Sequence, residues 1–408
     1  MMRILPACAA MAVVIGSVTF AAATAGAQML PSDPVTFGDG RVVVGGDVAV
    51  AVSPPDRGFF NYGDYEQTTL RQFRLGLTGL VRLNDRVSFL GELRSGNLRT
   101  IEPFAFYARV RPFPDRRLDI QIGRIPPTFG SFTRRTYGHD NPLIGLPLAY
   151  QYLTSIRSDV APGDADELLR MRGRGWLSNF SYGNPQPERG VPLVSALTWD
   201  TGVQVTTGWR ILSVAAAVTN GTVSNPRVAD DNAGKQFAAR VSATPATGLI
   251  VATSFARGEF LNRQVRSLLG PAADGYSYAQ RAHGADVEYS RDRWLVRADA
   301  VFSQWQMPLP AHGPAPVPLR AVGVALEGRY TFLPGFYGAA RAEHLAFNRI
   351  AGVARRDEWD APVTRLEVGG GYAVQRNLSA RLSLQLNARD GGRVERARFV
   401  AAQMLYWF

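Results

Sequence analysis

The chain has 408 residues, of which 46% are apolar, with a single cysteine and a formal net charge of +11. This apolar fraction excludes a largely disordered chain. Lys235 is the only lysine, so nearly all of the positive charge is arginine, and the arginines are spread along the chain. We therefore expect no nucleic-acid partner, because a basic chain that binds nucleic acid usually gathers its charge on one element or face.

The first 27 residues have the three parts of a secretory signal peptide. Arg3 supplies the positive start, Ile4 to Phe20 is an uncharged apolar run, and Ala25-Gly26-Ala27 is a small-residue cleavage site. An uncleaved membrane anchor is the alternative, because the run is long enough to span a bilayer. Cleavage removes Cys8, the only cysteine. The exported protein then has no disulfide or metal thiolate, and we expect no metal and no cofactor.

Residues 28–40 form a polar, proline-containing lead-in, which we assign to the periplasm. From residue 41 onward, apolar and polar residues alternate with the period of two that is typical of strands. The clearest segment is 70–83, where Phe73 and Leu75 flank Arg74. Facing an arginine into lipid near the bilayer midplane costs about 2 to 4 kcal/mol, so this polar row is predicted to face a lumen.

Sixteen such segments follow one another, and the connections between them alternate between short and long. Bacterial outer-membrane barrels have an even strand number, short periplasmic turns and longer outer loops. A soluble sheet is the alternative, but it has no reason to sort loop lengths by side. The sequence therefore predicts an all-β, transmembrane antiparallel β-barrel over 41–408 in the bacterial outer membrane, with sixteen strands, or eighteen as the alternative. The segments are 41–53, 70–83, 87–96, 101–113, 118–123, 193–207, 211–219, 235–244, 249–260, 280–290, 294–306, 319–332, 336–347, 362–375, 378–390 and 394–408.

The last segment carries a candidate assembly signal. Met404, Tyr406 and Phe408 are alternate residues of an apolar row that ends on an aromatic carboxyl terminus. This resembles the terminal strand of outer-membrane barrels, in which a closing phenylalanine after alternating apolar residues is the signal for assembly. The resemblance implies that Tyr406 and Phe408 are read by the barrel assembly machinery. Outer-membrane lipid and lipopolysaccharide are the other expected partners.

A sixteen-stranded barrel leaves an aqueous channel, and its wall is predicted from the inward rows. In 101–113, Phe104, Phe106, Ala108 and Val110 are expected to face lipid, and Tyr107, Arg109 and Arg111 are expected to face the lumen. Acids share the inward rows with the arginines, so cross-strand pairing is the alternative to free positive charge. The arginines that we assign to the pore wall are Arg74, Arg94, Arg109, Arg111, Arg297 and Arg381.

The connection 124–192 is too long to be a passive linker. Within it, Asp164 as N-cap, Glu167 as its reciprocal partner and Gly173 as the stop predict a short helix. Folded inward after the fifth strand, this loop would narrow the pore and set carboxylates against guanidiniums. The alternative is a loop on the outer rim with solvated charges. The candidate constriction residues are Arg134, Arg135, Asp164, Asp166, Glu167, Arg170, Arg172 and Arg174.

Two runs, Phe106 to Pro114 and Leu118 to Gly130, have a strand, a proline-containing turn, a second strand and a Pro-Phe-Gly-like exit. This pattern resembles the phosphate-selective porin O/P family. The resemblance implies a sixteen-stranded, usually trimeric channel whose third loop folds into the pore, with arginine ladders and a lysine cluster that guide anions. The chain departs from the family pattern at Thr128, which interrupts the exit motif, and in having one lysine.

We predict a porin-like diffusion channel for small anionic or neutral hydrophilic solutes, with a modest anion preference and a homotrimeric assembly. We expect no enzymatic activity, because the four histidines show neither metal-ligand spacing nor a partner nucleophile. The alternative is a non-conducting barrel, plugged by 124–192, that acts as a surface-binding or structural scaffold.

Overall fold

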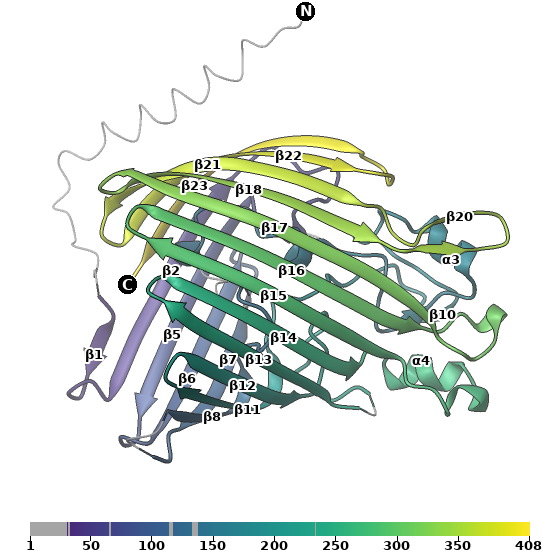
Figure 1. Ribbon diagram of the computed structural model, residues 1–408, viewed down its shortest axis with the longest axis horizontal. Helices are drawn as coiled ribbons and strands as arrows, with labels where there is room; N and C mark the ends of the chain where they lie inside the picture. The colour runs from purple at the N-terminus through teal and green to yellow at the C-terminus, as the bar shows by residue number, and fades with distance from the viewer. Residues whose placement is uncertain (1–30, 32, 65–66, 114–116, 133–137, 233) are drawn as a thin grey trace, which may run out of the picture.

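The computed structural model describes residues 31, 33–64, 67–113, 117–132, 138–232 and 234–408. The predicted signal peptide, 1–27, lies outside the described residues. Within them, sixteen antiparallel strands close into one barrel (Figure 1). Each strand pairs with its neighbours around the barrel, and β2 (Val42–Val52) closes it by pairing with β23 (Arg396–Trp407). The sixteen-strand barrel predicted from the sequence is therefore confirmed.

The strands between β2 and β23 follow the predicted segments closely. Their short connections lie at the end of the barrel that holds the carboxyl terminus, and the long ones lie at the opposite end (Figure 1). The strands are β5 (Gln72–Arg82), β6 (Val87–Gly96), β7 (Thr100–Val110), β8 (Leu118–Ile125), β11 (Asp200–Trp209), β12 (Leu212–Thr219), β13 (Gln236–Ala246), β14 (Leu249–Glu259), β15 (Ala279–Arg291), β16 (Trp294–Met307), β17 (Val317–Leu333), β18 (Phe336–Phe347), β21 (Val363–Gln375) and β22 (Leu378–Arg389).

Short elements decorate the loops and the lumen. Three helices, α2 (Leu148–Gln151), α3 (Ala165–Arg170) and α4 (Arg263–Leu268), occur in the described part of the chain. Among the described residues, no helix is long and apolar enough to cross a lipid bilayer. The remaining short elements are β1 (Val35–Phe37), β3 (Tyr62–Asp64), β4 (Gln67–Thr68), β9 (Val160–Ala161), β10 (Tyr182–Gly183), β19 (Arg349–Ala351), β20 (Arg356–Glu358), η2 (Gly138–Asp140), η3 (Pro271–Ala273) and η4 (Pro310–His312).

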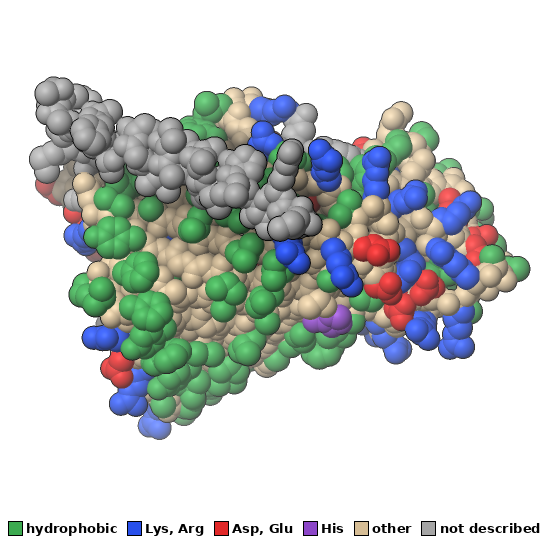
Figure 2. Space-filling view, turned by 90° about the horizontal axis from the view of Figure 1, so that it is seen from above, with side chains coloured by type: hydrophobic (Ala, Val, Ile, Leu, Met, Phe, Trp, Pro, Cys, Tyr) green, Lys and Arg blue, Asp and Glu red, His purple; other side chains and the backbone are tan. Residues whose placement is uncertain are grey.

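The outside of the barrel is apolar. On β23, Val400 and Met404 are 43% and 46% exposed, whereas Ala401 and Leu405 are 1% and 0% exposed, as the alternating pattern predicts. Figure 2 shows apolar side chains over the body of the barrel and charged side chains at both of its ends, with the larger group at one end. Large aromatic residues are exposed at the short turns, as a girdle at a membrane interface requires. They are Phe113, Trp209, Tyr289, Trp294, Phe332 and Phe336.

The inside of the barrel has a packed apolar core, which the sequence patterns did not predict. Residues from the long connection between β8 and β11 pack against inward side chains of the strands in one continuous cluster. Trp305, Val301 and Leu345 are strand residues in this cluster, and all three are fully buried. Part of the lumen is therefore filled by side chains instead of water.

Two local predictions were wrong. The strand predicted from 193 begins only at Asp200, because Leu193 and Val194 are buried in the lumen core and Val194 N–H donates to the carbonyl oxygen of Ala149 at 3.0 Å. Phe104 was expected to face lipid, but it is buried and lines an inner cavity. A β-bulge in β7 adds one residue at this point, which turns its side chain inward.

The first and last strands meet in a seam. Gly46 and Phe408 exchange two backbone hydrogen bonds, each 3.0 Å long. β23 pairs with Asp47 to Val52 of β2, and β1 pairs with the preceding part of the same strand edge, Val42 to Val44. Part of the predicted lead-in thus extends the sheet at the carboxyl-terminal end of the barrel.

Candidate functional site

Residues 138–153 run through the lumen and cover the inward faces of β16, β17, β18 and β21, which we call the covered wall. The wall holds this inner segment by its backbone. Gly145 N–H donates to Glu367 Oε1 at 3.0 Å, and Leu148 N–H donates to Glu343 Oε1 at 2.7 Å. These bonds need close contact, since a Cβ on Gly145 would lie 2.5 Å from Glu367 Oε2.

Arg341 is the centre of the covered wall. Its guanidinium pairs with Glu327 at 3.1 Å, with Glu343 at 3.1 Å and with Glu367 at 2.9 Å. It also donates to the carbonyl oxygen of Gly145 at 2.7 Å. The arginine is 1% exposed, so three carboxylates and one carbonyl satisfy it away from water.

Two other inward arginines also bind the inner segment, Arg365 of the covered wall and Arg381 of the neighbouring strand β22. Arg365 donates to the carbonyl oxygens of Leu146 at 3.1 Å and Phe60 at 2.8 Å. Arg381 donates to the carbonyl oxygen of Gly138 at 2.6 Å. A guanidinium has several N–H donors in one fixed plane, so a single arginine can bind more than one carbonyl oxygen. The inner segment is therefore fixed to the barrel along its length.

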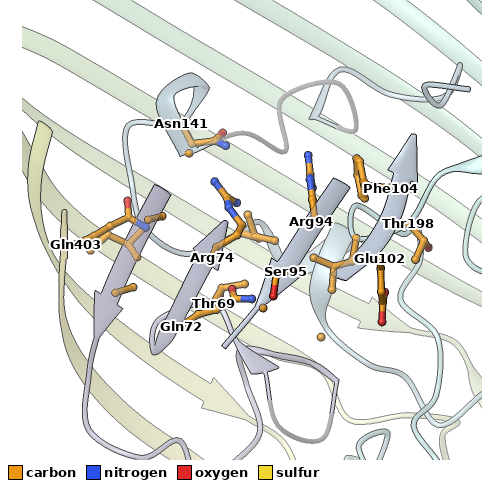
Figure 3. A pocket seen from close by; sticks show the side chains of 18 of the residues that line it. Thr69, Gln72, Arg74, Arg94, Ser95, Glu102, Phe104, Asn141, Thr198 and Gln403 are labelled. Carbon is orange, nitrogen blue, oxygen red and sulfur yellow. The ribbon is translucent and has the colours of Figure 1, made fainter. Parts of the chain in front are cut away.

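A cavity of about 190 Å³ lies between the inner segment and the inward faces of β2, β5, β6, β7 and β8, which we call the open wall. In Figure 3, Arg74 and Arg94 rise from neighbouring strands toward Asn141 of the inner segment, and Phe104 lies beside Arg94. The charged residues that line this middle cavity are five arginines and one carboxylate, namely Arg74, Arg94, Arg124, Arg189, Arg381 and Glu102.

Two of these arginines have carboxylate partners. Arg74 pairs with Asp47 at 3.0 Å, in the space left by the missing side chain of Gly76 on the neighbouring strand. Arg94 pairs with Glu92 at 2.5 Å, and its guanidinium carbon lies 3.3 Å from the centre of the Phe104 ring. These two charges are partly neutralised, and their side chains are held in place.

The other three are held by neutral groups. Arg124 donates to the carbonyl oxygens of Trp199, at 3.0 Å, and Pro103, and Arg189 donates to that of Gly63. Arg381 is bound to the carbonyl of Gly138, as described above. Among the described residues, no carboxylate lies within ion-pair distance of Arg124, Arg189 or Arg381. The cavity therefore keeps an excess of positive charge.

Two further cavities are present, and one of them adjoins the middle cavity. An outer cavity of about 310 Å³ shares four lining residues with the middle one, namely Gly63, Arg189, Leu197 and Thr198. At the end with the short turns, an inner vestibule of about 880 Å³ is lined by Arg86, Arg109, Arg111 and Arg117 together with Asp85 and Asp119. On the covered wall, the space beneath the inner segment is much smaller, a cavity of about 30 Å³ beside Tyr150, Arg297 and Arg341.

The predicted wall arginines fall into three groups. Arg74, Arg94 and Arg381 come together in the middle cavity. Arg109 and Arg111 line the inner vestibule, where both bind Asp119. Arg297 lies on the covered wall, where it pairs with Glu288 at 2.8 Å and Glu327 at 3.2 Å. Cross-strand pairing, the alternative considered for these arginines, describes Arg297 best.

The helix predicted around Asp164 forms as α3. Asp164 accepts from Glu167 N–H at 2.7 Å, Glu167 Oε2 accepts from Gly163 N–H at 2.5 Å, and Gly173 has a φ of +65°. In Figure 1, α3 lies with β10, β20 and α4 at the end of the barrel that carries the long loops. Asp166 accepts from the backbone N–H groups of Val353, at 2.7 Å, and Ala354.

These backbone donors, with Ala354 first, hold the pKa of Asp166 below its usual range. Arg172 pairs with Asp357 at 2.8 Å and with Glu358 at 3.5 Å, so both ends of α3 bind the β19–β20 hairpin. Arg170 is in the last turn of α3, and Arg174 follows it. Arg134 and Arg135 lie outside the described residues. A constriction formed by these residues stays a prediction.

The connection 124–192 folds inward after the fifth strand, as predicted, and residues 138–153 are bound inside the barrel. The sequence patterns did not single out this stretch, which contains Pro142-Leu-Ile-Gly-Leu-Pro-Leu-Ala-Tyr150, an apolar run within the loop. Leu148 and Tyr150 are buried, and the Tyr150 hydroxyl donates to Asp299 at 2.9 Å. An apolar run of this length in a connection was the available signal, because it has to be buried somewhere.

A closed sixteen-strand barrel with an apolar exterior and charged inner cavities is a porin-like barrel of the bacterial outer membrane. No family model matches the sequence, and neither does any curated protein. Solved structures share the fold. The anion-selective porin from Comamonas acidovorans has a TM-score of 0.56 at 10% identity, over 90% of this chain and 99% of that chain.

Two further structures match at similar identity. OmpT of Vibrio cholerae with loop L8 deleted, an outer membrane protein, has a TM-score of 0.54 at 12% identity, over 90% of this chain and 99% of that chain. The outer membrane channel DcaP of Acinetobacter baumannii has a TM-score of 0.53 at 11% identity, over 92% of this chain and all of that chain. At these identities the likeness establishes the fold alone.

Proposed function

We propose that this protein is an outer-membrane porin, a passive diffusion channel for small hydrophilic solutes with a modest preference for anions. The observation that carries the proposal is the middle cavity, in which five arginines face one lining carboxylate. Its continuity with the outer cavity supports a path for solutes. The similar anion-selective porin from Comamonas acidovorans and the channel DcaP support the same function.

The mechanism is selection by size and charge along one side of the lumen. The inner segment narrows the space to the middle cavity, so solutes must be small and must pass close to the open wall. Arg124, Arg189 and Arg381, which have no carboxylate partner in the described part of the chain, attract anions, and the low dielectric of the surrounding protein strengthens this attraction. The carboxylates of Asp47 and Glu92 offset part of the charge, which keeps the preference modest.

Reversal potentials in a salt gradient across a planar bilayer test the anion preference. We expect the purified protein to favour anions, and we expect Arg124→Gln, Arg189→Gln and Arg381→Gln together to remove that preference. Arg210→Gln, which changes an exposed turn arginine, is the matched control and should leave the potential unchanged. Cation preference in the unchanged protein contradicts the proposal.

The second candidate function is a non-conducting scaffold. The apolar core inside the barrel favours it, because that core fills part of the lumen with the connection between β8 and β11. Single-channel recording separates the two candidates. A full-length protein that stays silent, but conducts after deletion of 131–175, would identify the connection as a plug.

The finer architecture that the O/P family resemblance implies is also part of the proposal. Phe129 is buried, Gly130 has a φ of +72°, and its N–H donates to Ser254 Oγ at 3.1 Å, so the exit motif directs the chain into the lumen. Thr128, which interrupts the motif, accepts a hydrogen bond from Gln204. Comparing phosphate with chloride conductance tests whether the selectivity follows the resemblance.

We also propose a homotrimer that is assembled through the carboxyl-terminal signal. OmpT of Vibrio cholerae, at 10% identity and a TM-score of 0.50, has a structure in a trimer form, which supports this assembly. Native mass spectrometry of the detergent-solubilised protein measures the subunit number. Tyr406→Ala and Phe408→Ala test the signal, since both should lower the amount of folded barrel in the outer membrane without changing secretion across the inner membrane.

A further inference from the structure

The outward face of β14, β15 and β16 changes character near the long loops. Phe255, His283 and Phe302 lie side by side in register and form the last aromatic row on this face. One alternate residue further toward the long loops, Arg257 on β14 and Arg281 on β15 also point outward and are exposed. Aromatic residues mark the membrane interface, so the two arginines are at the level of lipid headgroups.

The two arginines face each other directly. Arg257 and Arg281 are partners in the register of β14 and β15. Among the described residues, none forms a hydrogen bond or an ion pair with either guanidinium. Glu259, two residues further along β14, is already bound by Ser277 Oγ and by the backbone N–H of Tyr278. Like charges directly opposite each other on adjacent strands are destabilising. Among the described residues, no counter-ion offsets the repulsion between these two arginines.

The neighbouring strands add donors to this pair. Arg281 is in register with Gln304 on β16, and Gln304 is in register with Arg320 on β17. Arg320 Nε donates to Gln304 Oε1 at 3.3 Å and is exposed. The outward row of β15 from Arg281 to Tyr289 contains no acidic residue. The strip is therefore basic, faces the membrane and has no acid between its charges.

We propose that Arg257, Arg281 and Arg320 form a binding site for the phosphate groups of lipid A in the outer leaflet. Guanidiniums bind phosphate through two parallel, charge-assisted hydrogen bonds, and a phosphate between Arg257 and Arg281 removes their repulsion. The apolar row below the arginines is suited to the acyl chains of the same molecule. The site is on the outside of the barrel, so it does not depend on whether the lumen conducts.

Binding of diphosphoryl lipid A to the purified protein in neutral detergent tests the proposal. Each charge-assisted hydrogen bond is worth enough to change affinity about tenfold, so Arg257→Gln with Arg281→Gln should weaken binding at least about tenfold. Arg396→Gln with Arg398→Gln is the matched control. These residues are also exposed outward arginines, but they face Ala388 and Leu386 instead of another arginine, and the control should change affinity less than about threefold.

A second measurement separates lipid binding from a structural role. Without lipid A, Arg281→Gln should raise the thermal stability, because the like-charge contact is removed, and with lipid A it should reduce the stabilisation by the ligand. Equal affinity of the variant and the unchanged protein overturns the proposal, as does equal binding of dephosphorylated lipid A. A variant that changes the subunit number in native mass spectrometry but not lipid binding also overturns it, because the strip would then be a contact between copies of the chain.

Discussion

Arg341 and Arg94 both point into the barrel from strands of the same sheet, but their surroundings differ. Arg341 on the covered wall has three carboxylate partners and lies beneath the inner segment. Arg94 on the open wall has Glu92 as its ion-pair partner and lines a cavity. An inward arginine therefore indicates neither a pore nor a structural contact by itself.

Two features distinguish a structural arginine from one that lines a cavity: the number of carboxylates nearby and whether the inner segment covers them. On the covered wall, the carboxylates compensate buried guanidiniums and also accept hydrogen bonds from the inner segment, so the charges hold the loop in place. Around the middle cavity, Arg124 of the open wall, Arg189 and Arg381 are held by neutral carbonyl groups, so among the described residues no carboxylate compensates their charge. We therefore propose that the covered wall contributes to stability and the open wall to selectivity.

Arg341→Met should have the largest effect, because it leaves three buried carboxylates without their common partner. Breaking a buried ion pair in this way costs about 3 to 5 kcal/mol. The temperature at which the folded band disappears on an unboiled denaturing gel measures the loss. Adding Glu327→Gln should recover part of it, and an unchanged temperature for Arg341→Met would show that the covered wall is not what holds the inner segment.

Gly145→Ala should have the next largest effect. The new Cβ would be 2.5 Å from Glu367 Oε2 and 2.7 Å from Gln385 Nε2, so the inner segment has to move away from the covered wall. Overpacking of this kind costs about 1 to 3 kcal/mol. Because the segment moves toward the middle cavity, single-channel conductance should fall. Gly328→Ala on β17 is the control, since a Cβ there meets no atom within 4 Å, and equal conductance of the two variants would rule out this displacement.

Asp47→Asn sharpens the description of the open wall. It removes the carboxylate that pairs with Arg74, so the anion preference should increase and the reversal potential should shift further in the anion direction. This is opposite in sign to the shift expected from the arginine variants. Asp292→Asn changes an exposed turn residue and serves as the control. A shift toward cations would contradict the role of Arg74 in the middle cavity.

The smallest expected effect concerns α3 and the β19–β20 hairpin. Backbone donors lower the pKa of Asp166. Its contribution to the stability of the contact with the hairpin is therefore fully present above the pKa of an aspartate in the unfolded chain, about 3.9, and is lost as the pH falls through the lower folded value. The hydrogen bond from Arg349 lowers the pKa of Glu358 to about 2. The ion pair between Glu358 and Arg172 is therefore lost only as the pH falls toward that value.

Hydrogen-exchange protection of the amides at 352–355 should therefore be constant from pH 7 to pH 5 and should fall below about pH 4. Asp166→Asn should reduce the protection already at pH 7. Ser267→Ala, in the exposed loop that contains α4, is the control. Protection that falls between pH 7 and pH 5 would show that another group holds the hairpin.

The strands were predictable because a membrane barrel imposes one strong pattern. A residue that faces lipid has to be apolar, so rows such as the one ending at Met404 and Tyr406 report their side of the sheet directly. The side of the sheet was predicted wrongly for Phe104, because one bulge residue in β7 reverses the alternation and no sequence pattern indicates where a bulge occurs. The capped helix α3 was also predictable, since its signals are local.

The site was less predictable because it depends on contacts between distant parts of the chain. The residues of α3 bind a hairpin almost 190 positions later, as in the hydrogen bonds that Val353 N–H and Ala354 N–H donate to Asp166. The pairing of Arg341 with Glu367 and with Gly145 depends in the same way on where a loop lies in the finished barrel. The alternating pattern of each strand identified the arginines that face inward. It could not divide them between the covered and open walls, because that division depends on where the inner segment lies.

The seam between β2 and β23 has a consequence for biosynthesis. Asp47 pairs with Trp407, 360 positions later, and Gly46 pairs with the final residue. A product of a premature stop codon that lacks β23 keeps two unpaired sheet edges, which are templates for aggregation. Closure of the barrel therefore requires both β2 and β23, and a chain without β23 exposes strand edges that can pair with other chains.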